Sequence, residues 1–143
     1  GNRAGGAGPR LMRDGEVPGG INAARPDARA DMCIGVGGSP EGIVTACAIK
    51  ALGGHSQGRM WPRDDAERQR GIDAGLKMDY VYEADELVKG NNTIFVATGV
   101  TDGQLVSGVR RAGDWLYTES VVLRGASGTL RRISSEHLTS KWL

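Results

Sequence analysis

The sequence has little cysteine, few aromatic side chains and almost no net charge. Its two cysteines, Cys33 and Cys47, are too few for a disulfide framework or a cysteine-rich metal cluster. The 18 basic and 17 acidic residues leave a formal charge of +1, so there is no basic excess and we expect no nucleic-acid partner. No apolar run approaches the roughly 20 residues of a membrane span, and we expect no membrane partner. These absences indicate a soluble, cytoplasmic globular protein.

Glycine is abundant instead, with 23 residues among 143. Residues 1–9 are rich in glycine and poor in apolar surface, so burial cannot offset their ordering entropy and we expect them to be flexible. Residues 10–143 are expected to form one α/β unit. Because the chain starts with Gly1 and not with methionine, we expect a processed or truncated chain.

Strand and helix patterns alternate along the rest of the chain. This order predicts an α/β protein with flanking helices and a mixed sheet, parallel at first and with antiparallel strands appended. Ser39 is the expected N-cap of one helix, Asp64 and Arg68 are spaced to pair on another, and both cysteines are expected to be buried. The expected strands are 32–36, 56–61, 93–98, 115–124 and 129–133, and the expected helices are 21–24, 40–52, 63–74 and 99–109.

The most informative segment is IGVGGSPEG, residues 34–42. Glycines let the backbone approach a ligand, and the first N–H groups of the helix that follows favour an anion such as phosphate. The segment is not a dinucleotide-binding loop, because Pro40 stands where the third glycine belongs, and no Gly-Lys-Ser/Thr of a Walker loop follows. Glu41 either complements the helix dipole, which its spacing alone favours, or binds Mg²⁺ or Mn²⁺ beside a substrate phosphate.

Two further segments place carboxylates in predicted turns. Asp14 and Glu16 flank Gly15, where they could bind sugar hydroxyls or metal, although a solvated turn is favoured from the tripeptide alone. Asp102, in the segment ATGVTDG, is most simply the N-cap of a helix. No serine, histidine and aspartate combination forms a recognisable triad, so the catalytic residues stay unassigned.

Four segments occur together in one order: DGEV at 14–17, residues 34–42, FVATGVTDG at 95–103, and TESVVLRGASGTLRRI at 118–133. Taken together they resemble the C-terminal half of class II fructose-1,6-bisphosphatases, which are metal-dependent phosphatases of the inositol-monophosphatase-like superfamily. The resemblance implies half of a layered α-β-α-β-α fold. It also implies hydrolysis of the 1-phosphate of fructose 1,6-bisphosphate in gluconeogenesis, with Mn²⁺ or Mg²⁺ as cofactor.

The resemblance also implies roles for particular residues. Glu41 falls on a metal ligand, Gly38 on a substrate contact, and Asp14, Gly15 and Glu16 on the substrate-binding segment, where the family has aspartate in place of Glu16. The family's other metal ligands belong to an upstream motif that is absent from this sequence. We therefore expect a truncated phosphatase that binds a sugar bisphosphate and lacks most metal ligands. The alternative is a non-catalytic sugar-phosphate-binding or regulatory module, and assembly into a homo-oligomer is left open.

Overall fold

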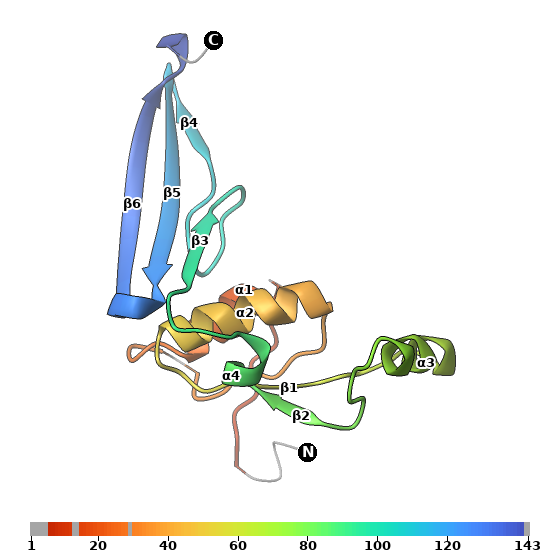
Figure 1. The fold of residues 1–143 in the computed structure, drawn as a ribbon. Helices are drawn as coiled ribbons and strands as arrows, with labels where there is room; N and C mark the ends of the chain where they lie inside the picture. The colour runs from red at the N-terminus through yellow and green to blue at the C-terminus, as the bar shows by residue number, and fades with distance from the viewer. Residues whose placement is uncertain (1–5, 13–14, 29, 142–143) are drawn as a thin grey trace.

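The computed structural model describes residues 6–12, 15–28 and 30–141, which form a helix pair, a four-stranded sheet and a projecting arm (Figure 1). The helix pair consists of α1 (Glu16–Ala23) and α2 (Ser39–Ala51). The sheet consists of β3 (Ile94–Thr98), β4 (Arg110–Ala112), β5 (Trp115–Arg124) and β6 (Thr129–Leu138), with the 3₁₀ turns η2 (Gly125–Ser127) and η3 (Thr139–Lys141) following β5 and β6. The arm consists of β1 (Gln57–Arg59), α3 (Asp65–Asp73) and β2 (Val81–Glu83), and α4 (Ala84–Leu87) follows it.

β5 is the central strand of the four-stranded sheet. It pairs with β6 along its whole length on one side, and on the other side with β3 and β4 one after the other. The predicted α/β class with flanking helices is confirmed, and so is the β5–β6 hairpin. Every strand pair in the described residues is antiparallel, whereas the strand–helix order had predicted a parallel part. The reason is that the first predicted strand, residues 32–36, does not form, so no crossover joins two parallel strands.

The core lies between the helix pair and one face of the sheet. Side chains alternate between the two faces of a strand, so Val121 and Leu123 of β5 point to the same side as Phe95 of β3. These three residues pack with Ile21 of α1 and Ala48 of α2 in one buried cluster. Close contact of the helices depends on glycine in α1, because a Cβ on Gly20 would lie 2.5 Å from the Cγ2 atom of Thr45.

Helix α2 follows its sequence signals closely, with one correction at its start. Pro40 stands in the first turn, and Glu41 and Lys50 complement the dipole at the two ends. The N-cap is Gly38 and not Ser39, because Gly38 has extended backbone angles (φ −66°, ψ 147°) and Ser39 is already helical. α1 is longer than predicted, since it begins at Glu16 and not at residue 21.

The apolar run at residues 32–36 is an exposed chain and not the predicted buried strand. Met32, Ile34 and Val36 are 68%, 71% and 71% exposed, and no described strand pairs with them. Cys33 is therefore exposed, contrary to the prediction, whereas Cys47 is half-buried on α2. Apolar composition alone predicted this strand, but a strand also needs a neighbouring strand whose N–H and C=O groups remain available.

Residues 99–109 form a loop that folds onto the sheet and not the predicted helix. Asp102 accepts a hydrogen bond from the Gly108 N–H at 2.9 Å, so it closes the loop and does not cap a helix. The carboxylate of Glu119 on β5 accepts a hydrogen bond from the Ser107 N–H at 2.7 Å, and Arg132 donates to the Leu105 carbonyl at 2.8 Å. These long-range bonds hold the loop in place, and they depend on residues that lie far away in the sequence.

The Glu119 contacts predict an acid-sensitive stability. Hydrogen bonds from Ser107, followed by the nearby Arg132 guanidinium, hold the pKa of the Glu119 carboxyl below its ordinary value of 4.5. A carboxyl with a lowered folded-state pKa adds stability above its unfolded pKa and loses that stability as the pH falls through the folded value. We expect the Tm to fall as the pH drops below 4.5, and Glu119→Gln to remove part of this fall. Thermal unfolding followed by circular dichroism from neutral pH downward tests this, and an identical pH profile for both proteins would contradict it.

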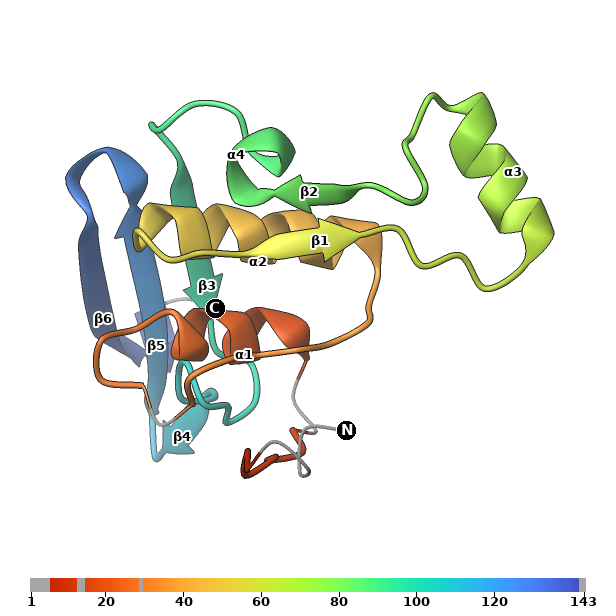
Figure 2. The same cartoon turned by 90° about the horizontal axis from the view of Figure 1, so that it is seen from below.

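The arm extends away from the helix pair and the sheet, with α3 at its end (Figures 1 and 2). None of the residues of α3 is buried. Asp64 caps this helix by accepting a hydrogen bond from the Glu67 N–H at 2.7 Å, and Arg68 pairs with Asp79 at 2.5 Å. The predicted Asp64–Arg68 pair is therefore wrong, because the N-cap position turns the Asp64 carboxylate toward the backbone. None of the helices in the described ranges has the length and apolar character that crossing a bilayer requires.

Candidate active site

The starts of the two helices lie at the same end of the helix pair. Gly15 is the N-cap of α1 and Gly38 is the N-cap of α2, and Figure 2 shows the two helices side by side and beginning on the same side. The first N–H groups of a helix have no intrahelical partners, and the macrodipole adds partial positive charge there. This end of the molecule therefore offers two sets of backbone donors to an anion.

Glu41 folds back over the N-cap of its own helix. A Cβ built on Gly38 would overlap the Oε2 atom of Glu41, so the carboxylate occupies space that only a glycine leaves open. The backbone of this turn is fixed by hydrogen bonds from the Gly42 N–H to the Gly38 carbonyl at 3.0 Å and from the Thr45 hydroxyl to the Glu41 carbonyl at 2.8 Å. The Glu41 carboxylate is exposed and makes no hydrogen bond or ion pair with any residue that the structure describes. Its oxygens are available to a ligand.

The structure brings together part of the predicted site. Gly15 is exposed at the start of α1, and Glu16 is the first residue of that helix. Asp14 lies outside the described residues. The sequence had not predicted that Gly15 and Glu16 lead directly into a helix, although a glycine before an acidic residue, with Pro18 in the first turn, is a recognisable start signal.

The donor atoms at this end of the molecule decide whether a divalent cation could bind there. Carboxylate oxygens are suitable ligands for Mg²⁺ or Mn²⁺, and the Glu41 carboxylate could be one of them. Within residues 6–12, 15–28 and 30–141, no three or more His, Cys, Asp or Glu side chains are gathered where they could hold a metal ion. The described residues could therefore offer the Glu41 carboxylate to a divalent cation, and a complete site would need further oxygen ligands.

A comparison with protein family models shows to which family the chain is related. The family model described as bacterial fructose-1,6-bisphosphatase, glpX-encoded, matches residues 2–137. The chain belongs to this family. The resemblance drawn from the four sequence segments is thereby confirmed, and the helix-flanked antiparallel sheets agree with an α/β phosphatase fold.

Curated relatives carry the same family name. The class 2 fructose-1,6-bisphosphatase of Haemophilus influenzae is 39% identical over 137 residues, which cover 87% of this chain and 41% of the relative. The fructose-1,6-bisphosphatase 1 class 2 of Escherichia coli strain K12 is 37% identical over the same length and with the same coverage. This chain therefore spans about two fifths of the length of the relatives that it matches. The family is one of fructose-bisphosphatases, which are hydrolases of carbohydrate metabolism.

Proposed function

We propose that this chain forms part of a metal-dependent phosphatase that hydrolyses the 1-phosphate of fructose 1,6-bisphosphate to give fructose 6-phosphate and phosphate. This is a step of gluconeogenesis, and we place it in the cytoplasm. The observation that carries the proposal is the Glu41 carboxylate, which is exposed and has no partner among the described residues. It belongs to the start of α2, at the end of the helix pair where α1 also begins, and helix starts favour an anion. Membership of the fructose-bisphosphatase family supports the choice of substrate.

The proposed roles of the site residues follow from their positions at the starts of α1 and α2. Glu41 would hold a divalent cation, Mn²⁺ or Mg²⁺, which when bound supplies Lewis-acid chemistry toward a phosphoryl oxygen. Gly38 would let the substrate approach the backbone at the start of α2, while Asp14, Gly15 and Glu16 would bind the sugar hydroxyls or phosphate near the start of α1. The N–H groups at the helix starts would stabilise negative charge that develops on the transferred phosphate.

A second candidate function is a non-catalytic module that binds or senses a sugar phosphate. The observation that favours it is that no three His, Cys, Asp or Glu side chains of the described residues are gathered to hold a metal ion, whereas a catalytic cation needs several oxygen ligands. Such a module would bind fructose 1,6-bisphosphate in the presence of a chelator. The two functions therefore differ in the metal dependence of binding and in the release of phosphate.

The test is phosphate release from fructose 1,6-bisphosphate, with Mn²⁺ and with a chelator. It uses this chain alone and this chain mixed with the part of the Haemophilus influenzae relative that it does not span, which we call the complementing part. We expect Mn²⁺-dependent release by the mixture and little by either component alone, because neither holds a full ligand set. Substrate binding that persists in chelator without release from any preparation would favour the second function.

The Gly38→Ala variant should change the metal dependence of the candidate site without changing the stability of the fold. The new Cβ would displace the Glu41 carboxylate, which is the end of a flexible side chain, so the free energy of unfolding should change by less than about 1 kcal/mol. The displaced ligand should raise the Mn²⁺ concentration needed for half-maximal phosphate release by about tenfold, as disturbed metal ligands do. A Mn²⁺ titration of the mixture and a thermal melt measure the two effects. Unchanged Mn²⁺ dependence would contradict the role given to Glu41.

A further inference from the structure

Strand β6 is an outer strand of the four-stranded sheet. Its ten residues pair with β5 without interruption, and no strand of the described residues pairs with its other edge (Figures 1 and 2). The strand contains no proline and no glycine, and the continuous register with β5 leaves no bulge. Proteins usually shorten, bend or cover such an edge, because its unpaired N–H and C=O groups can bind another strand. β6 therefore offers a long and regular edge to a partner strand.

The hydrogen bonds of the sheet identify which backbone groups face this edge. The Thr139 N–H donates to the Asp114 carbonyl at 2.8 Å, which continues the β5–β6 pairing by one residue pair. Hydrogen-bonded and non-hydrogen-bonded pairs alternate along an antiparallel pair of strands, so the odd-numbered residues of β6 bond to β5. The even-numbered residues direct their N–H and C=O groups toward the open edge. These five residues are Leu130, Arg132, Ser134, Glu136 and Leu138.

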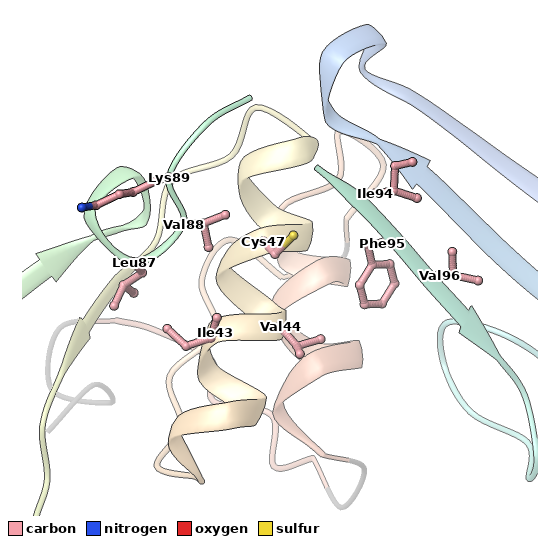
Figure 3. A pocket seen from close by; sticks show the side chains of 9 residues that line it. All are labelled: Ile43, Val44, Cys47, Leu87, Val88, Lys89, Ile94, Phe95 and Val96. Carbon is pink, nitrogen blue, oxygen red and sulfur yellow. The ribbon is translucent and has the colours of Figure 1, made fainter. Parts of the chain in front are cut away.

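The side chains of these five residues, the edge residues, lie on one side of the sheet. Leu130 pairs with Leu123 on β5, and Leu123 pairs with Phe95 on β3, so all three share this side. Figure 3 shows the same side on β3, where Phe95 points toward α2 and Val96 points away from it. The order of the edge residues is apolar, basic, hydroxyl, acidic and apolar. This order is symmetric about its centre except that the two charges are opposite.

A second copy of β6 complements the first when the two strands run antiparallel about Ser134. Ser134 then faces its own counterpart, and Arg132 faces Glu136 of the other copy. Leu130 faces Leu138 in the same way. All five edge residues form hydrogen-bonded pairs in this register, and opposite charges lie directly across from each other twice.

Other registers of the same two strands fit less well. A register centred on Arg132 or on Glu136 places two like charges directly opposite each other. A register centred on residue 133 or 135 places a leucine opposite a charged side chain. The side chains therefore select the register centred on Ser134.

The charged edge residues are available for such pairs. Glu136 is exposed and makes no hydrogen bond or ion pair with any residue that the structure describes. The Arg132 side chain is 40% exposed, and its Nη1 group binds the Leu105 carbonyl at 2.8 Å and the Glu119 carboxylate at 3.3 Å. The Nη2 group of the same guanidinium can donate to a second carboxylate.

We propose that β6 pairs with β6 of a second copy of this chain about a two-fold axis at Ser134, which joins two four-stranded sheets into one sheet of eight strands. Such a contact uses the same surface of both copies. Backbone hydrogen bonds of the added strand supply affinity, and the side-chain pairs fix the register. The inference does not rest on the proposed phosphatase activity.

A cysteine at the axis tests this pairing directly. In a chain with Cys33→Ser and Cys47→Ser, the Ser134→Cys substitution places two thiols across a hydrogen-bonded pair, whose Cα atoms lie about 5.5 Å apart and within disulfide range. Oxidised glutathione is the oxidant, and mass spectrometry follows the disulfide-linked dimer. We expect this dimer to form at least about tenfold faster than with Ser140→Cys. The two copies of residue 140 lie roughly 40 Å apart in the proposed register.

A charge reversal tests the register by a second measurement. Glu136→Arg places arginine opposite Arg132 at two symmetric positions, so we expect the dimer Kd from sedimentation equilibrium to rise about tenfold. Asp73→Arg makes the same change of net charge at the exposed end of α3 and should leave the Kd unchanged.

Four results would overturn the proposal. They are a monomer at every concentration, equal cross-linking of the Ser134→Cys and Ser140→Cys variants, an equal Kd for Glu136→Arg and Asp73→Arg, and loss of cross-linking on addition of the complementing part. The last result would mean that a strand of the complementing part occupies the edge. Cross-linking through residue 134 that persists in this mixture supports the pairing of two copies.

Discussion

Replacing Glu41 by glutamine is expected to reduce Mn²⁺-dependent phosphate release from fructose 1,6-bisphosphate by at least about 100-fold, since groups that merely support metal ligands already change affinity or activity by roughly 10–100-fold. The amide keeps the size of the side chain and its place over Gly38 but removes the negative charge that a hard cation requires. The assay is phosphate release by this chain mixed with the complementing part of the Haemophilus influenzae relative.

The matched control is Asp65→Asn on α3. Both carboxylates stand in the first turn of a helix, so both substitutions lose a dipole contribution of about 0.3–1 kcal/mol. Asp65 belongs to the projecting arm, away from α2 (Figure 2), so its amide should leave phosphate release unchanged. Equal loss of activity in both variants would show that the Glu41 effect arises from helix stability. Full activity of Glu41→Gln would contradict its role as a metal ligand.

Truncating Leu123 to alanine is expected to give the largest loss of stability, about 2–5 kcal/mol in the free energy of unfolding. Leu123 is 1% exposed on the central strand of the sheet, where it pairs with Phe95 on β3 and Leu130 on β6. Removal of the side chain leaves a cavity between the sheet and the helix pair. The neighbouring side chains cannot fully relax into it, because β5 is paired with a strand on each side. The Tm should fall by roughly 5–15 °C.

Ile133→Ala provides the comparison for this core variant. Ile133 lies on β6, on the opposite face of the same sheet, and is 43% exposed. Its truncation should cost about 1 kcal/mol, well below the cost at Leu123, because a large part of the side chain already faces water. Urea unfolding of both variants measures the difference. A similar cost for the two would mean that the second face of the sheet is as well packed as the first.

The sequence predicted the local backbone setting of Gly38 and Glu41 better than the arrangement of the two helices, while the roles of the site residues stay predictions. The glycines before α2 and the position of Glu41 in its first turn are local features, and the structure has them in place. That α1 begins at Glu16 and runs parallel to α2 was not predicted. The side-by-side placement of the two helix starts depends on the close approach of Gly20 to Thr45, which joins residues 25 positions apart.

The fold shows the same difference between local features, which the sequence predicts, and long-range arrangement, which it does not. The sequence by itself determined α2, β3 and the β5–β6 hairpin, because glycine, proline and apolar periodicity act over a few neighbouring residues. Only the tertiary structure decided that residues 32–36 stay unpaired and that residues 99–109 form a loop. A strand needs a partner with open hydrogen-bonding groups, and this loop is held by Glu119 and Arg132 from strands that follow it in the sequence. Such long-range contacts leave no local pattern in the sequence.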